Sequence, residues 1–229
     1  MLFARTLTIF LLAICSASAV ASMELSNVIL HFEPGEASRE DVEIYNPTDA
    51  PMYIQIEPKE VIAAGTEKEE RKLIQDPREA GLLVTPNKLV IPPGGTKVVR
   101  MVKLGATDKE RVYRIGAKPI VEGIESETSG LKILVGYEVL AIVYPSEAEP
   151  NLDVQRDGKK LVVKNAGNAN VLLREGYQCA SPKQDKDECT PLPGKRLYPG
   201  NSWELDLPED LPVRFYQSVG TRHFVETYP

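Results

Sequence analysis

Residues 131–145 read LKILVGYEVLAIVYP, and 131–144 of them form the longest candidate strand in the chain. Side chains of a β-strand alternate between two faces, so the odd-numbered positions share one face. That face is apolar throughout: Leu131, Ile133, Val135, Tyr137, Val139, Ala141 and Val143. The even-numbered face is apolar only in its second half and carries Lys132 and Gly136 in its first half. We therefore predict a strand whose second half is covered on both faces, while its first half offers one apolar row at an exposed edge.

A period of two recurs along the rest of the chain, and 18 prolines and 16 glycines break it often. This pattern predicts strands at 42–44, 52–56, 82–84, 89–91, 97–104 and 112–121. The turn Asn46-Pro47-Thr48-Asp49 predicts a hairpin between the first two of them. The charged segment 61–77 is expected to form a loop or a short helix.

An acidic segment bounded by prolines, PSEAEP at 145–150, is the best candidate for a linker. After it, short strands are expected at 152–154, 161–164, 170–177, 202–207, 213–218 and 223–227. We therefore predict an all-β fold of two tandem immunoglobulin-like β-sandwich domains, at residues 22–146 and 147–229.

The first 21 residues have the parts of a secretory signal peptide: a charge at Arg5, an apolar segment at 6–14 and small residues at 17–21. We expect cleavage after Ala21, with Ala19 as the second choice, and an exported product. A net charge of -6 argues against binding to nucleic acid or to an anionic membrane surface. No later apolar run approaches the roughly 18 residues that span a bilayer, so stable membrane insertion is not expected.

Removal of residues 1–21 leaves two cysteines, Cys179 and Cys189, which we expect to form a disulfide. A metal or redox site is disfavoured because CxxC spacing is absent and the two histidines, His31 and His223, are far away in the sequence. No GxSxG, HExxH or phosphate-binding glycine loop is present, so the sequence predicts no enzyme, no metal and no cofactor.

Several motifs in their order resemble the periplasmic chaperones of the chaperone-usher pilus pathway. They are Asn46 in a short turn, the segment 86–94 running into 98–100, Glu110-x-x-Tyr113, and the long strand ending at Pro145. The resemblance implies a periplasmic protein that binds pilus subunits by donor-strand complementation and delivers them to an outer-membrane usher. It also implies possible self-association of the free protein. The donor residues would be Leu131, Ile133 and Val135, with Tyr137 next in the row.

The chain departs from this family at two sites. Many members grip the terminal carboxylate of their client with an arginine of the first strand and a lysine late in the long strand. Here residues 24–31 contain no arginine, and the lysine position falls at or near Leu140. Arg114, Lys118 or Lys132 could take this role, but each is equally well explained as a solvated strand charge. In the family's charge cluster between the domains, Glu110 matches the acidic member, whereas Tyr144 stands where arginine is common.

Two other functions are weighed against the chaperone. A structural pilus subunit should carry an N-terminal extension of alternating apolar residues, and residues 23–32 alternate only partly. An exported enzyme or ligand-binding β-sandwich would need a site that the sequence does not display. For the donor row itself, the alternative is that Leu131, Ile133 and Val135 complete the core of their own sandwich.

Overall fold

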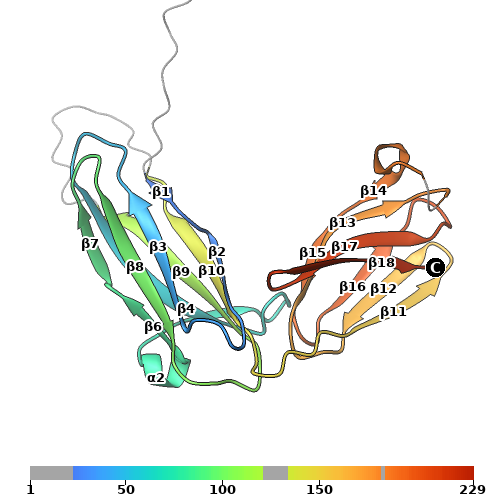
Figure 1. Cartoon of the computed structure of the whole chain (residues 1–229), viewed down its shortest axis with the longest axis horizontal. Coiled ribbons are helices and arrows are strands. Elements are labelled where there is room, and N and C mark those ends of the chain that lie inside the picture. The colour runs from blue at the N-terminus through green and yellow to red at the C-terminus, as the bar shows by residue number, and fades with distance from the viewer. Residues whose placement is uncertain (1–22, 121–133, 182–183) are drawn as a thin grey trace, which may run out of the picture.

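The computed structural model describes residues 23–120, 134–181 and 184–229. Its strands fall into two groups, which lie side by side and are joined by the segment between Val143 and Leu152 (Figure 1). No sheet of the described residues contains strands from both groups. We refer to β1–β10 as the first sandwich and to β11–β18 as the second sandwich. The domain bounds 22–146 and 147–229 themselves remain a prediction.

The first sandwich consists of two sheets whose inward residues form one core. One sheet has the order β1 (Glu24–Leu25), β3 (Arg39–Tyr45), β8 (Thr96–Lys103) and β6 (Leu82–Thr85). The other has the order β2 (Ile29–Phe32), β10 (Tyr137–Val143), β9 (Arg111–Ile120), β4 (Met52–Ile62) and β5 (Glu70–Leu73), and β7 (Lys88–Ile91) also pairs with β4. A short helix, α2 (Pro77–Ala80), precedes β6. Buried and exposed residues alternate along β3, β7 and β8, as the sequence pattern predicts.

The predicted hairpin at 46–49 is wrong. β3 pairs with β8, and β4 pairs with β5, β7 and β9, so the two strands lie in different sheets. The buried side chain of Asn46 explains the turn, because its Nδ2 donates to the carbonyl oxygens of Ala50 at 2.8 Å and Ile91 at 3.0 Å. These bonds hold the chain where it crosses between the sheets, a role that turn composition alone does not distinguish from a hairpin.

The prediction for 61–77 was also incomplete. β4 continues to Ile62, and the charged residues Glu70–Leu73 form β5. All four residues of β5 are exposed, so this strand has no buried face from which a period of two could be recognised.

The second sandwich has a sheet of β11 (Leu152–Asp157), β12 (Lys160–Asn165) and β16 (Ser202–Asp206). Its other sheet has the order β14 (Thr190–Leu192), β13 (Val171–Gln178), β17 (Val213–Val219) and β18 (Arg222–Tyr228), and β15 (Lys195–Leu197) also pairs with β13. Asn165 repeats the arrangement of Asn46, since its buried Nδ2 donates to Ala169 O and Leu197 O. Both sandwiches thus use a buried asparagine to fix the turn at a strand end.

The predicted disulfide is present between Cys179 and Cys189. It joins the end of β13 to the start of β14 and closes a loop that contains the 3-10 helix η2 (Lys186–Glu188). A closure of this length is expected to stabilise the fold by about 2–3 kcal/mol through the entropy of the unfolded chain.

Within the described ranges, no helix has the length and apolar character needed to cross a bilayer. Nor do three or more histidine, cysteine or acidic side chains gather there in a group that could hold a metal ion.

Candidate functional site

β10 is paired over its whole length on one side and only in its second half on the other. Along β9 the antiparallel register runs from Tyr137 opposite Ala117 to Val143 opposite Arg111. Along β2 the parallel pairing covers only Leu140–Val143, and it begins where Leu140 N donates to Val28 O at 2.9 Å. In the part of the chain that the structure describes, no strand pairs with the second side of residues 137–139. We call these three residues the open edge of β10.

The open edge exists because the N-terminal segment changes sheets. β1 pairs with β3 in one sheet, whereas β2, which begins four residues after β1 ends, pairs with β10 in the other. The segment between β1 and β2 therefore meets β10 only at its middle, where Leu140 N donates to Val28 O, and does not pair with residues 137–139. An unpaired strand edge presents backbone N–H and C=O groups that can pair with another chain.

The predicted strand 131–144 is shorter in the structure: among the described residues it begins at Tyr137, and residues 134–136, just before it, are not part of a strand. The odd-numbered residues nevertheless pass from the core to the surface toward this end. Val139, Ala141 and Val143 are buried in the core of the first sandwich, and Tyr137 is partly buried against it. Val135, two residues earlier, is 45% exposed. The row therefore extends beyond the core that it helps to form. Leu131 and Ile133, which the sequence places next in this row, lie outside the described residues.

The even-numbered row confirms that the second half of the strand is covered on both faces. Leu140, Ile142 and Tyr144 are buried, and they belong to a cluster with Leu161, Val171 and other residues of the second sandwich. The first sandwich's own core thus covers one face of this half of the strand, and the second sandwich covers the other. The core of the second sandwich is continuous with this outer face of the first.

Charged side chains occupy the even-numbered face beside the open edge. Glu138 accepts a hydrogen bond from Arg71 Nη1 at 2.8 Å. Glu57 forms ion pairs with Lys118 and with Lys59, whose Nζ lies 3.7 Å from Glu57 Oε2. The hydrogen bond from Lys118 is the main reason that the pKa of Glu57 lies below its usual value. Arg114 stands opposite Leu140 in the register, and no hydrogen bond or ion pair joins its side chain to the described residues. Of the three basic residues considered from the sequence, Arg114 is thus unpaired and Lys118 is paired, while Lys132 lies outside the described residues.

Tyr144 takes part in the contact between the two sandwiches. Its hydroxyl oxygen lies 3.1 Å from His31 Nδ1, 3.1 Å from Asn170 Nδ2 and 3.0 Å from Gly220 N. Asn170 also donates through N and Nδ2 to Oε2 of Glu110, at 2.6 and 2.7 Å. Burial raises the pKa of Glu110 to about 7. These hydrogen bonds connect the two sandwiches. We call the five residues that make them, Tyr144, His31, Asn170, Gly220 and Glu110, the joint.

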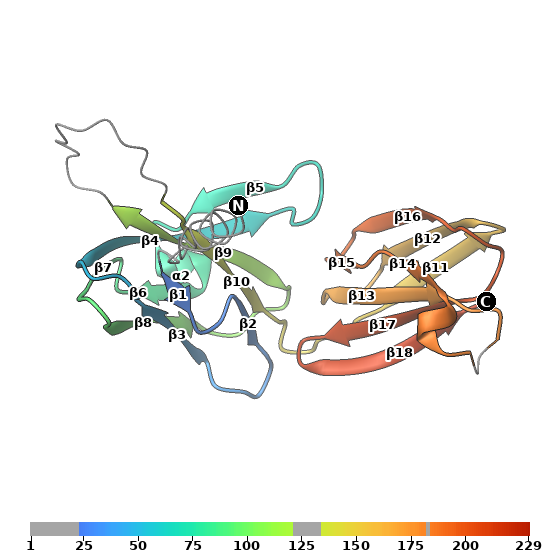
Figure 2. The ribbon, with the colours of Figure 1, turned by 90° about the horizontal axis from the view of Figure 1, so that it is seen from above.

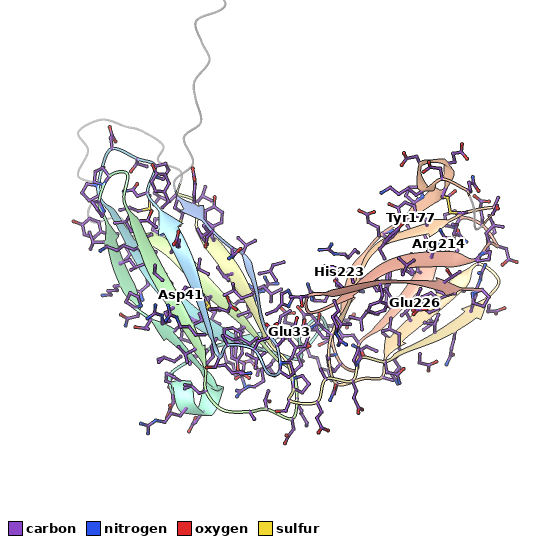
Figure 3. All side chains as sticks on the ribbon, in the orientation of Figure 1. Glu33, Asp41, Tyr177, Arg214, His223 and Glu226 are labelled. Atoms are coloured by element: carbon purple, nitrogen blue, oxygen red, sulfur yellow. A yellow bond between two sulfur atoms is a disulfide. The ribbon has the colours of Figure 1, made fainter. Side chains whose placement is uncertain are left out.

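The turn between β17 and β18 completes the contact. Of the second sandwich, this turn lies nearest to the first sandwich (Figures 1 and 2). Thr221 N in the turn donates a hydrogen bond to Glu33 Oε1. Figure 3 shows Glu33 between the two sandwiches. Gly220 in this turn has φ +57°, and a Cβ there would collide with the Glu33 carboxylate. The positive φ favours glycine here, and a larger residue would also displace the Glu33 carboxylate from its bond to Thr221 N.

Sequence reasoning missed an exposed apolar row on the first sandwich. Val90 of β7 stands opposite Tyr53 of β4, and Tyr53 stands opposite Ile120 of β9, so the three lie side by side across the sheet. All three are exposed. Alternation with the buried residues Ile54, Leu89 and Ile91 could have placed Tyr53 and Val90 on the outer face, but only the strand order makes the three neighbours.

Comparison with known proteins places these features in context. No family model matches the chain. A CS1 fimbrial protein of Escherichia coli, named as a fimbrial subunit, is 31% identical over 179 residues, which cover 74% of this chain and 75% of that protein. A CFA/I fimbrial protein of Escherichia coli, likewise named as a fimbrial subunit, is 28% identical over 203 residues, or 85% of each chain. Among solved structures, the class 5 fimbriae chaperone CfaA superimposes with a TM-score of 0.67 at 25% identity, covering 90% of this chain and 99% of the other.

Proposed function

We propose, because the chain belongs to the family of chaperone-usher fimbrial chaperones, that it binds pilus subunits in the periplasm through the open edge of β10. The observation that carries this proposal is the apolar row of β10, which reaches the edge of the core at Tyr137, beside a strand edge that no described strand pairs with. The segment just before β10 continues the apolar sequence with the exposed Val135. An edge of this kind can pair with the backbone of a partner while its alternate side chains fill the partner's groove.

In the proposed complex, Val135 and Tyr137, together with Leu131 and Ile133, enter the groove of a pilin that lacks its own last strand. The exposed groove of the pilin and the exposed part of the row are both removed from water, and this burial drives binding. The role is one of binding and protection, with no catalytic step.

We further propose that Arg114 receives the terminal carboxylate of the pilin. Arg114 lies on β9 directly opposite Leu140, the position at which the sequence lacks the expected lysine. Arg114 is partly buried, and its side chain has no carboxylate partner in the described part of the chain. The guanidinium of such an arginine can donate two parallel hydrogen bonds to a carboxylate.

The row of Val90, Tyr53 and Ile120 is the surface that we propose for the outer-membrane usher. It lies on β7, β4 and β9, whereas the pilin is proposed to occupy the far edge of β10 in the same sheet. Both partners could therefore bind together, which delivery of a loaded pilin requires. An exposed apolar cluster on a soluble domain is typical of a protein interface.

One observation favours a second function, a structural role within the pilus, because both curated relatives are named as fimbrial subunits. A pilin that donates a strand would need an unpaired N-terminal segment. In this chain Glu24–Leu25 already pairs with β3, and Met23 is buried in the core. The structural superposition also covers 99% of the chain of the chaperone CfaA. These observations favour the chaperone over the structural subunit.

The proposal is tested by co-expressing the tagged protein with the pilins of its host and identifying by mass spectrometry what co-purifies in one-to-one amount. We expect a small β-rich pilin that is lost with Val135→Asp, because a carboxylate cannot enter an apolar groove without a large desolvation cost. Val98→Asp is the matched control, since Val98 is 39% exposed on β8 of the other sheet. Loss of the pilin with both variants, or with neither, would contradict the assignment of the open edge.

A further inference from the structure

The hydroxyl of Tyr144 forms a complete set of hydrogen bonds in the joint. A tyrosine hydroxyl has one proton to donate and two lone pairs with which to accept. The N–H groups of Gly220 and Asn170, at 3.0 and 3.1 Å, occupy both lone pairs. The hydroxyl proton must therefore go to His31 Nδ1, at 3.1 Å. His31 can accept it only when Nδ1 carries no proton, that is, as the neutral ring protonated on Nε2.

We propose that the joint is held only while His31 is neutral, so that the placement of the two sandwiches loosens when His31 takes up a proton. A protonated His31 directs an N–H group at an oxygen whose acceptor sites are already filled. One of the three contacts at Tyr144 must then be lost. Two of these three contacts cross from the first sandwich to the second.

The groups that face His31 are Tyr144, Arg196 and Glu33, and Glu110 acts on Tyr144 next to them. Tyr144 follows β10, Arg196 lies on β15, Glu110 precedes β9, and Glu33 follows His31 just beyond β2. Burial is the main factor that lowers the pKa of His31 below its usual 6.5, and Arg196 lowers it further, while Glu33 acts in the opposite direction. Arg196 is held in place by its hydrogen bond to Asn170 Oδ1.

Glu110 keeps its contacts in either charge state. Its Oε2 accepts both hydrogen bonds from Asn170, and its buried Oε1 has no hydrogen-bond partner among the described residues. A proton on Glu110 therefore goes to Oε1 and leaves the bonds to Asn170 unbroken. His31 is then the group whose protonation breaks the joint.

The direction of the pH effect follows from these contacts. The joint favours neutral His31, so loosening begins as the pH falls below 6.5 and is complete below the pKa of His31 in the joint. Above 6.5, His31 is neutral in both arrangements and contributes no pH dependence. The inference concerns the contact between the sandwiches and does not rest on the partner proposed above.

The test uses the full mature chain with 15N-labelled histidine, followed by NMR from pH 4.5 to 8. The chain has two histidines, and His223 is exposed, so it serves as an internal control in the same spectra. The distance between the sandwiches is followed in parallel by energy transfer between dyes at Lys97→Cys on β8 and Glu204→Cys on β16, two exposed positions.

We expect His31 in the Nε2–H form at pH 8, a midpoint below 6.5, and a distance distribution that broadens at that same midpoint. An Nδ1–H tautomer, a midpoint at or above 6.5, or a distance distribution that is unchanged through the midpoint would overturn the proposal.

Variants separate the joint from a general loss of structure. Tyr144→Phe should shift the His31 midpoint toward 6.5 and give a broad distance distribution at every pH. His31→Asn keeps a neutral acceptor near the Nδ1 position, so its distribution should stay narrow down to pH 5, whereas His223→Asn should respond like the wild type. If Tyr144→Phe does not fold, His31→Asn decides alone, because a pH response that persists in this variant refutes the proposal.

Discussion

Valine-to-alanine changes at positions 139 and 135 should have opposite consequences, although the sequence places both residues in one apolar row. Val139 lies within β10, whereas Val135 lies just before the strand begins at Tyr137. Val139 is 2% exposed in the core of the first sandwich. Its change to alanine removes two buried carbons, at about 0.8 kcal/mol each, and leaves a cavity, so we expect the free energy of unfolding to fall by about 2 kcal/mol. Val135 is 45% exposed, so the same change should cost the free protein less than about 1 kcal/mol.

For the affinity for the pilin, in contrast to the stability of the free protein, the change at Val135 should matter. The part of Val135 that is exposed in the free protein becomes buried in the proposed complex, and its loss is worth about 0.7 kcal/mol, or roughly a threefold weaker affinity. Urea unfolding of the free variants and titration calorimetry with the purified pilin measure the two quantities. If Val135→Ala destabilised the free protein as much as Val139→Ala and left the affinity unchanged, the row would belong to the protein's own core, and the reasoning would fail.

Three further changes test other parts of the structure. Replacement of both Cys179 and Cys189 by serine should lower the free energy of unfolding by about 2–3 kcal/mol, which denaturant midpoints with and without a reductant will show. Asn46→Ala leaves the carbonyl groups of Ala50 and Ile91 without their donor, and should cost about 1–3 kcal/mol in urea unfolding, whereas an exposed control, Asn87→Ala, should change it little. Glu110 has a pKa near 7 in the folded protein, so stability should fall as the pH rises from about 4.5 through 7, and Glu110→Gln should remove this loss in unfolding measured at pH 5 and pH 8.

The sequence was sufficient to predict the strands that have one buried face. Val42 and Ile44, for example, alternate with polar neighbours, and the structure buries them in β3. Its failures have local causes. The turn at Asn46 has the composition of a hairpin, but the hydrogen bond that directs the chain to the other sheet goes to Ile91, 45 residues away. Period and composition are properties of neighbouring residues and cannot identify such a partner.

The candidate site also has a part that the sequence predicts and a part that only the structure reveals. The alternation within 131–144 predicted the buried residues of β10, but the described strand begins only at Tyr137, and Leu134 and Val135 before it are both exposed. The donor row itself stays a prediction. The role of Tyr144 could not be predicted, because its partners His31 and Gly220 lie 113 and 76 residues away. Likewise, the absence of arginine and lysine at the expected positions was visible in the sequence, but the position of Arg114 opposite Leu140 became known only from the strand register.

The two rows of β10 also bear on how a bound pilin can leave. A slip of one residue along the strand would exchange Val139 and Ala141, which fill the first sandwich, with Leu140 and Ile142, which pack against the second. Both rows oppose such a slip, so a force applied along the strand axis meets resistance over the whole length of β10. We therefore expect a bound pilin to move away from β10 in the plane of the sheet, breaking one backbone hydrogen-bonded pair at a time. The rate at which the pilin dissociates should then depend on the first pair to open rather than on the total length of the contact.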